Sequence, residues 1–186
     1  MAKIENSMNL LAQLEHSNRT NKVLHQNQHE NGLTFWGIYE SMHPDWKGWG
    51  AVKSCMAFFP REIEKASKVL FETGWIYGLV IEFYKKEFWD KMKLDQVVSQ
   101  KIADELFIFG VNVNWRIAAM KCQKYIGVPA DGFIGNQTLE VLNKFDENKF
   151  DIEFDDIEKK YYDEIIKSKP YLAINKKGWY KRADAV

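Results

Sequence analysis

Apolar side chains recur at helical spacing along most of this chain, and this pattern limits the possible folds more than any other feature. Near the N-terminus, Ile4, Met8 and Leu11 occupy positions i, i+4 and i+7, which form one stripe of an α-helix. Further helices are predicted at residues 60–72, 79–92, 94–109, 115–126 and 137–145, and a last one follows residue 156 and runs through residue 167. The predicted class is therefore all-α, or mainly helical.

Residues 17–49 interrupt the helical pattern. Asn, His, Gly and Pro accumulate there, and no period persists. A loop of this length in a compact domain is usually functional. We expect an ordered loop with a small β-hairpin. A second turn is predicted at Pro129 and Asp131-Gly132. Residues 146–156 are predicted to form an acidic connection between helices. The aromatic rings of residues 178–182 are predicted to pack back on the body of the protein.

Length and charge exclude several classes of protein. The chain has 186 residues, which suits one globular unit, divided here into a lobe at 1–93 and a second, helical lobe at 94–186 packed against it. Because 26 basic residues balance 26 acidic ones, no net field would attract nucleic acid. No apolar run approaches the ~18 residues of a membrane span, so membrane insertion is not expected. Cys55 and Cys122 are predicted to be reduced core thiols.

Glu15 is the first candidate for chemistry. It lies at i+11 from Ile4, on the apolar stripe of the first helix. Burial would raise the pKa of its carboxyl and keep it protonated, as the general acid of glycosidic cleavage must be. The sequence therefore predicts a desolvated acid at the end of this helix, although a surface glutamate would have the same spacing.

A series of segments in a fixed order carries a resemblance to a known family. Glu15 at the end of the first helix is followed by these segments: Asn31-Gly-Leu-Thr-Phe-Trp-Gly-Ile38, Phe83-Tyr-Lys-Lys-Glu-Phe-Trp-Asp90, Val111-Asn112, Gln123-Lys-Tyr-Ile-Gly-Val128, Asp131-Gly-Phe-Ile-Gly-Asn-Gln-Thr-Leu139 and Gly178-Trp179. Together they resemble the N-acetylmuramidase family of phage-type lysozymes and secretion activator proteins, glycoside hydrolase family 108. The last segments resemble its C-terminal peptidoglycan-binding part.

The resemblance implies a lysozyme-like helical fold and hydrolysis of the β-1,4 bond between N-acetylmuramic acid and N-acetylglucosamine, with Glu15 as general acid and no cofactor. It implies bacterial peptidoglycan as the partner and, as in phage lysins, release by a separate holin or export system. The polar start of the chain, Met1 to Asn6, does not resemble a secretory signal. The expected location is cytoplasmic as made, with action on the cell wall or periplasm after release.

The chain departs from the family pattern around Glu15. The family usually reads Glu-Gly-Gly-Tyr, and this chain reads Glu15-His-Ser-Asn18. The family's loop aspartate corresponds to His29, beside Glu30, and Thr34 lies nineteen residues after Glu15. The second catalytic group is therefore predicted to be Glu30, or a water held by Thr34, with Glu40 as a weaker candidate.

Four residues are predicted to bind the substrate. Trp36, inside the loop, is the best candidate for stacking on a sugar. Tyr84 and Trp89 lie five apart on one helix and diverge by about 140°, so one of the two should belong to the core. Asn112 is predicted either to bind an N-acetyl group or to cap a helix.

Two other functions stay open on the sequence. His16, His25, His29 and His43 are close in sequence, so a zinc hydrolase is conceivable, although no His-Glu-x-x-His motif is present. The altered surroundings of Glu15 are also compatible with a non-catalytic protein that binds peptidoglycan or assists secretion.

Overall fold

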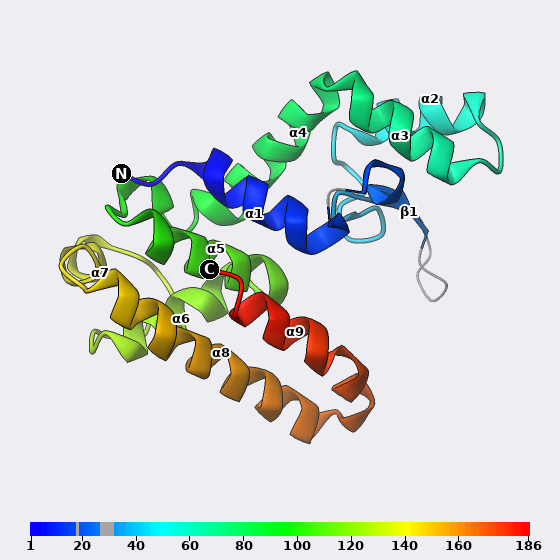
Figure 1. The fold of residues 1–186 in the computed structure, drawn as a ribbon. Helices are drawn as coiled ribbons and strands as arrows, with labels where there is room; N and C mark the ends of the chain where they lie inside the picture. Colours follow the sequence, from blue (N-terminus) through cyan, green and yellow to red (C-terminus); the bar gives the residue numbers. More distant parts are fainter. Residues whose placement is uncertain (18, 27–31) are drawn as a thin grey trace. The chain divides into compact units, whose positions relative to one another are not determined.

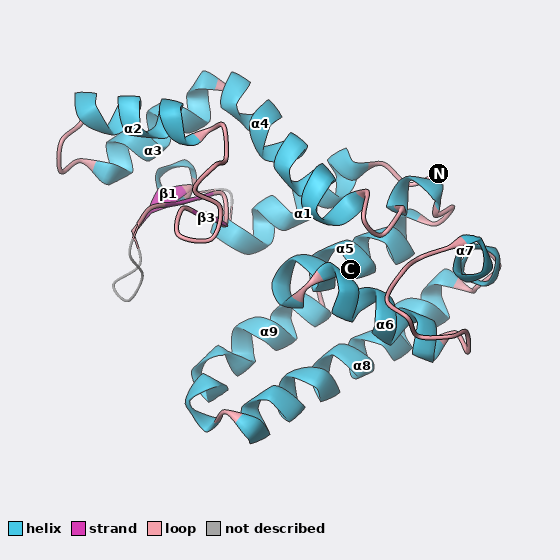
Figure 2. Cartoon of the chain, turned by 180° about the vertical axis from the view of Figure 1, so that it is seen from behind, coloured by secondary structure: helices cyan, strands magenta, loops and turns pink. Residues whose placement is uncertain are grey.

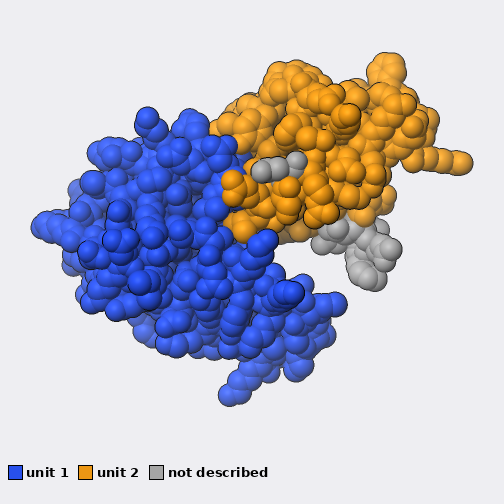
Figure 3. Space-filling view, viewed as in Figure 1, with its two compact units in different colours: residues 1–10, 85–186 blue, residues 11–84 orange. Residues whose placement is uncertain are grey.

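The structure is a computed structural model of residues 1–186 that describes residues 1–17, 19–26 and 32–186 (Figure 1). Its contacts divide the chain into two compact units (Figure 3). Unit 1 comprises Met1–Leu10 and Lys85–Val186, and unit 2 comprises Leu11–Tyr84. One boundary falls inside helix α1 (Ile4–His16), and the other falls at the end of helix α4 (Trp75–Tyr84). The functional division into lobes at 1–93 and 94–186 stays a prediction.

Unit 2 combines helices with a small sheet. After α1 come the 3₁₀ turn η1 (Thr20–Lys22), the strands β1 (Leu24–His25), β2 (Thr34–Phe35) and β3 (Ile38–Tyr39), and the helices α2 (Trp49–Phe58), α3 (Ile63–Thr73) and α4. Among the described residues, the three strands form an antiparallel sheet in the order β1-β2-β3 (Figure 2). The mainly helical class and the small β-element in the early loop are both confirmed.

The regular elements of unit 1 are helices joined by turns and loops. Besides the start of α1, its elements are the π-helical segment η2 (Lys85–Trp89), η3 (Leu94–Gln96), α5 (Gln100–Val113), α6 (Trp115–Tyr125), α7 (Asn136–Leu142), α8 (Glu147–Ser168), η4 (Pro170–Asn175) and α9 (Lys176–Ala183). Helix α5 packs against α6, α8 and α9, and nearly all of its side chains from Ile102 to Phe109 are buried. This helix therefore forms the centre of the core of unit 1.

Several helix boundaries differ from those predicted by the sequence. Helix α3 begins at Ile63 rather than at Pro60, because Arg61 adopts a left-handed conformation (φ 69°) that ends the preceding turn. Helix α2 was not predicted, since its buried residues, Trp49 and Val52, are too few to give a clear stripe.

The acidic segment 146–156 is also helical, contrary to the prediction of a connection. Asp146 caps helix α8, because its carboxylate accepts a hydrogen bond from the backbone N–H of Lys149 at 2.7 Å. Phe150 and Phe154, four residues apart, then bury one side of the first turns and stack on each other with ring centres 4.8 Å apart. The four-residue spacing of these two phenylalanines is the sequence signal for this part of the helix, but the many acidic residues around them favoured a prediction of a loop.

The C-terminal residues and the cysteines behave as predicted. The Trp179 ring stacks on Tyr162 with centres 5.1 Å apart, so the tail does pack back on the body of unit 1. Cys122 is buried and Cys55 is half-buried, and both are free thiols. Within the described residues, no helix is both long and apolar enough to cross a membrane.

Candidate functional site

Glu15 lies in the last turn of α1 and is exposed, so the prediction of a buried, desolvated carboxyl is wrong. The stripe of Ile4, Met8 and Leu11 is buried as expected. At the end of the helix, however, burial passes to the next residue, His16, which contacts the ring of Trp36 edge-on with centres 4.5 Å apart. The periodicity of the sequence predicts which face of a helix is buried, but it does not predict at which residue the neighbouring segments stop covering that face.

The β2–β3 hairpin brings a tight turn to the Glu15 carboxyl. Trp36 and Gly37 form the two-residue turn, and both have positive φ angles of 50° and 75°. A Cβ atom on Gly37 would lie 3.4 Å from Cδ of Glu15 and 2.8 Å from the hydroxyl oxygen of Tyr84. The second glycine of the Gly-x-Thr-x-x-Gly-Ile motif is therefore required both for backbone conformation and for close approach to Glu15.

Tyr84 fixes this turn rather than binding a sugar, which corrects the prediction. Its side chain is only 2% exposed, and its hydroxyl donates a hydrogen bond of 2.7 Å to the backbone carbonyl of Trp36. A bulky residue with positive φ is strained, and such strain persists only where the surroundings hold it. Tyr84 is thus a positioning residue for the turn against which Glu15 lies.

Trp36 is 6% exposed, so it cannot serve as the open stacking ring that the sequence predicted. Its ring is surrounded by His16, by Phe71 in a parallel stack at 6.0 Å, and by Tyr77 at 4.8 Å. Phe71 is 37% exposed and Tyr77 is half-buried, so these two rings carry the aromatic group to the surface. Sequence reasoning missed both, because α3 and α4 meet the hairpin only in the folded chain.

His16 replaces a glycine of the family pattern and fills the space beneath Trp36. It is 4% exposed, and neither ring nitrogen has a hydrogen-bond partner. Burial lowers the pKa of the imidazole, while the neighbouring charge of Glu15 acts in the opposite direction. His16 is therefore held as a neutral ring next to the candidate acid.

The candidates for the second catalytic group fall in different places. Thr34 is buried in β2, in register with His25 and Tyr39, and its catalytic role stays a prediction. Glu30 lies outside the described residues. Glu40 accepts a hydrogen bond from the backbone N–H of Leu33 at 3.0 Å and pairs with Lys53 at 2.7 Å. The bond from Lys53 is the main cause that lowers the pKa of the Glu40 carboxyl.

The remaining predicted sugar ligands belong to unit 1. Trp89 is buried with its ring centre 5.8 Å from that of Phe107, so it is a core residue, and its predicted contact with sugar is wrong. The amide nitrogen of Asn112 donates a hydrogen bond of 2.8 Å to the buried hydroxyl of Tyr162. This side chain therefore serves the core of unit 1 rather than an open surface.

The described histidines do not assemble a metal site. The ring of His43 contacts Phe83, and Nδ1 of His25 lies 3.3 Å from the carbonyl oxygen of Lys22. In the described part of the chain, the group of side chains with metal-binding spacing is Glu105, Asp151 and Asp155 of unit 1, which contains no histidine. His29 lies outside that part. The zinc alternative thus gains no support from the described residues.

Comparisons with known proteins confirm the family resemblance. Residues 22–113 match the family model of Glycosyl hydrolase 108, and residues 100–184 match the Predicted Peptidoglycan domain. The fold is similar to the structure of Brucella abortus SagA, with a TM-score of 0.62 and 19% sequence identity over 97% of this chain and 91% of that one. No curated protein matches the chain. These matches support a peptidoglycan hydrolase in general.

Proposed function

We propose that this chain, a glycosyl hydrolase 108 region followed by a predicted peptidoglycan domain, hydrolyses the β-1,4 bond between N-acetylmuramic acid and N-acetylglucosamine with Glu15 as general acid. The observation that carries the proposal is the seating of the Glu15 carboxyl on Gly37, in a strained turn that Tyr84 holds from a distant helix.

The exposure of Glu15 fits a polymeric substrate. A glycan strand has to reach the carboxyl from outside, and its arrival removes water from around the acid. The exposed Phe71 and the half-buried Tyr77, both beside Trp36, offer apolar faces on which a sugar ring can lie. Glu15 would then protonate the leaving oxygen, while Glu30 or a water held by Thr34 acts from the opposite side of the sugar.

The substrate also sets where the protein has to act. Peptidoglycan lies outside the cytoplasm, so we propose that the chain reaches it by a separate membrane pore or export system.

The test compares Glu15→Gln with Glu5→Gln on purified peptidoglycan. Both residues are exposed on α1, so the second variant controls for the loss of one surface charge. We expect Glu15→Gln to lose at least about 100-fold in rate, because the amide cannot donate the proton, and Glu5→Gln to keep the wild-type rate. Mass spectrometry of the reduced products identifies the bond, since a muramidase leaves muramic acid at the new reducing ends.

One alternative has an observation in its favour. The exposed Glu15 stands in a Glu-His-Ser-Asn sequence where the family has Glu-Gly-Gly-Tyr, which is compatible with a non-catalytic wall-binding protein. That alternative predicts sedimentation of the wild-type chain with peptidoglycan and no new reducing ends. Unchanged hydrolysis by folded Glu15→Gln would instead refute the assignment of the acid, and loss of activity with a chelator would favour the zinc hydrolase.

A further inference from the structure

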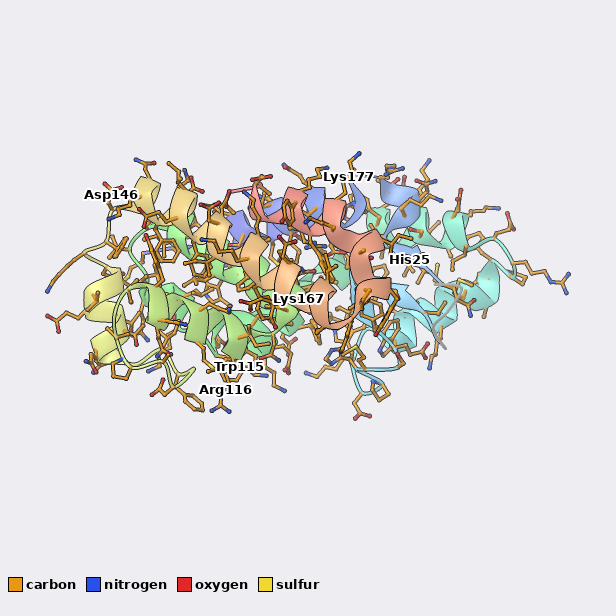
Figure 4. The ribbon with its side chains drawn as sticks, turned by 90° about the horizontal axis from the view of Figure 1, so that it is seen from below. His25, Trp115, Arg116, Asp146, Lys167 and Lys177 are labelled. Atoms are coloured by element: carbon orange, nitrogen blue, oxygen red, sulfur yellow. The ribbon has the colours of Figure 1, made fainter. Side chains whose placement is uncertain are left out.

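A group of carboxyl side chains gathers between α5 and α8 in unit 1. Helix α8, near whose two ends Asp146 and Lys167 are labelled in Figure 4, packs against α5. Glu105 of α5 and Asp151 and Asp155 of α8 each offer one oxygen, and these three oxygens lie within 4.8 Å of one another. We call these three residues the carboxylate cluster. Oxygens that bind one Ca²⁺ at about 2.3–2.6 Å are at most about 5 Å apart, so one cation can contact all three.

Two carboxyls of the cluster have a buried oxygen without a partner. Glu105 is only 1% exposed. Within the described part of the chain, Oε1 of Glu105 and Oδ1 of Asp155 are buried and accept no hydrogen bond. Buried acceptors are nearly always paired in folded proteins, because an unpaired one loses its bonds to water without replacement. These two oxygens therefore lack a partner that a bound cation would supply.

Glu158 brings a fourth carboxyl to the same place. It follows Asp155 by one helical turn on α8 and is 1% exposed. Its carboxyl lies beside those of Glu105 and Asp155, and Arg182 of α9 supplies a positive charge nearby. Among the described residues, Oε2 of Glu158 is also buried without a hydrogen-bond partner. A side chain outside the cluster therefore shows the same shortage of positive partners.

Two lysines neutralise the cluster only in part. Nζ of Lys101 lies 2.8 Å from Oδ2 of Asp151, and Nζ of Lys159 lies 3.2 Å from Oδ2 of Asp155. Lys159 also pairs with Asp184, so its charge is shared. These lysines and the nearby arginine are fewer than the four carboxyls that they face in the described residues. The ionised group therefore keeps an excess of negative charge, which a divalent cation would balance.

We propose that Glu105, Asp151 and Asp155 bind one hard divalent cation of the Ca²⁺ or Mg²⁺ class, with Glu158 beside it, and that the ion ties α5 to α8. Oxygen ligands select this class, since softer metals favour imidazole and thiolate groups, and the cluster contains neither. Asp151 and Asp155 are half-buried, so the ion can enter from the surface and keep water ligands on that side. The inference does not rest on the proposed function, because the cluster uses no residue of unit 2.

Calorimetric titration of the full chain tests the proposal, after EDTA has removed bound metal and has itself been dialysed away. CaCl₂ and, separately, MgCl₂ are the titrants. We expect one cation per chain and a melting temperature that rises by several degrees when the ion is in about 100-fold excess over Kd. Glu105→Gln and Asp155→Asn each remove one anionic ligand and should weaken binding by about tenfold or more. In EDTA, Glu105→Gln should melt at least as high as the parent, so misfolding would not explain its lost response.

Matched controls separate the cluster from general effects of charge. Asp156→Asn and Glu164→Gln remove exposed acids of the same helix and should keep the affinity of the parent. NaCl at equal ionic strength should not reproduce the rise in melting temperature. Failure of both Ca²⁺ and Mg²⁺ to bind would overturn the proposal, and so would binding that Glu105→Gln and Asp155→Asn leave unchanged.

The same preparations keep this inference distinct from the proposed hydrolysis. Hydrolysis by the parent, measured well below its melting range, should continue in EDTA, because Glu15 belongs to unit 2 and the cluster belongs to unit 1. A chain that binds Ca²⁺ through the cluster but releases no reducing ends from peptidoglycan would refute the proposed hydrolysis and leave this inference standing.

Discussion

The two units bury opposite kinds of ionisable group. Among the described acidic, basic and histidine side chains of unit 2, the buried one is His16, and the candidate acid Glu15 beside it is exposed. In unit 1 the buried groups are acids, Glu105 and Glu158, each with an oxygen that has no hydrogen-bond partner. Burial raises the pKa of Glu105 and Glu158 well above the usual range, and the nearby charge of Asp155 acts in the same direction on both.

This difference teaches that a buried carboxyl does not by itself locate the chemistry of the chain. The acids of unit 1 have the raised pKa values that a general acid needs, yet they lie in the core between α5 and α8, where a polymer cannot reach them. Glu15 has the access and the positioned turn. In this molecule, the carboxyl that a polymer can reach and the carboxyls that are buried belong to different units.

The largest expected effect concerns the continuity of unit 1. A fragment of residues 94–186 should fail to melt cooperatively, because it lacks the N-terminal residues that complete the unit. The backbone N–H groups of Ala2 and Lys3 donate to the Val97 carbonyl at 2.8 Å and to Gln100 at 2.7 Å, and Ser7 donates to Asp104. Calorimetry of this fragment is compared with that of a permutant in which residues 1–10 are joined after residues 85–186. The comparison measures how far cooperative folding of unit 1 depends on its N-terminal residues. A cooperative transition in the bare fragment would contradict it.

The next effect concerns the turn at the candidate site of unit 2. Gly37→Ala should lower the free energy of unfolding by about 3 kcal/mol, because it adds backbone strain and displaces the buried Tyr84 hydroxyl. Gly78→Ala is the control, since Gly78 lies within α4 with open space around its Cα and should gain up to about 1 kcal/mol. Chemical denaturation of both variants gives the two values, and equal stabilities would show that the turn is not required.

A third prediction uses the buried acids of unit 1. Because the folded pKa of Glu105 lies above its unfolded value, its contribution to stability is complete at acidic pH and is lost as pH rises toward the folded pKa. Glu105→Gln should therefore stabilise the chain at pH 8 by about 2 kcal/mol and much less at pH 4. Melting temperatures across this range test the sign, with the exposed Glu164→Gln as control. A gain at pH 4 equal to that at pH 8 would contradict the linkage.

The smallest effect is the opposite pH dependence in unit 2. The lowered pKa of His16 means that its contribution to stability is present above the unfolded pKa and is lost as pH falls through the folded value. His16→Phe should therefore lose fewer degrees of melting temperature between pH 7.5 and pH 5 than the wild type does. His43→Phe, at a half-buried histidine, is the control. A wild type that loses no more degrees between pH 7.5 and pH 5 than His16→Phe does would contradict this sign.

Local patterns in the sequence determined much of this protein. Helical stripes predicted α1 and α6 nearly to their ends and located α5, although α5 begins six residues later and ends four residues later than predicted, and turn chemistry located the reversal at Asp131-Gly132. The ordered series of motifs also identified the family that the comparisons confirm. Each of these signals is carried by residues a few positions apart, so the chain alone is enough to read them.

Only the tertiary structure decided which of the candidate residues a substrate can reach. The hydrogen bond that holds the Trp36 turn comes from Tyr84, 48 residues further along the chain. Trp36 and Tyr84 were both predicted to bind sugar, and both are buried in the fold. The same packing covers His16 and leaves Glu15 exposed, although both belong to one helical turn. Burial depends on contacts between distant segments, and no spacing within one segment contains that information.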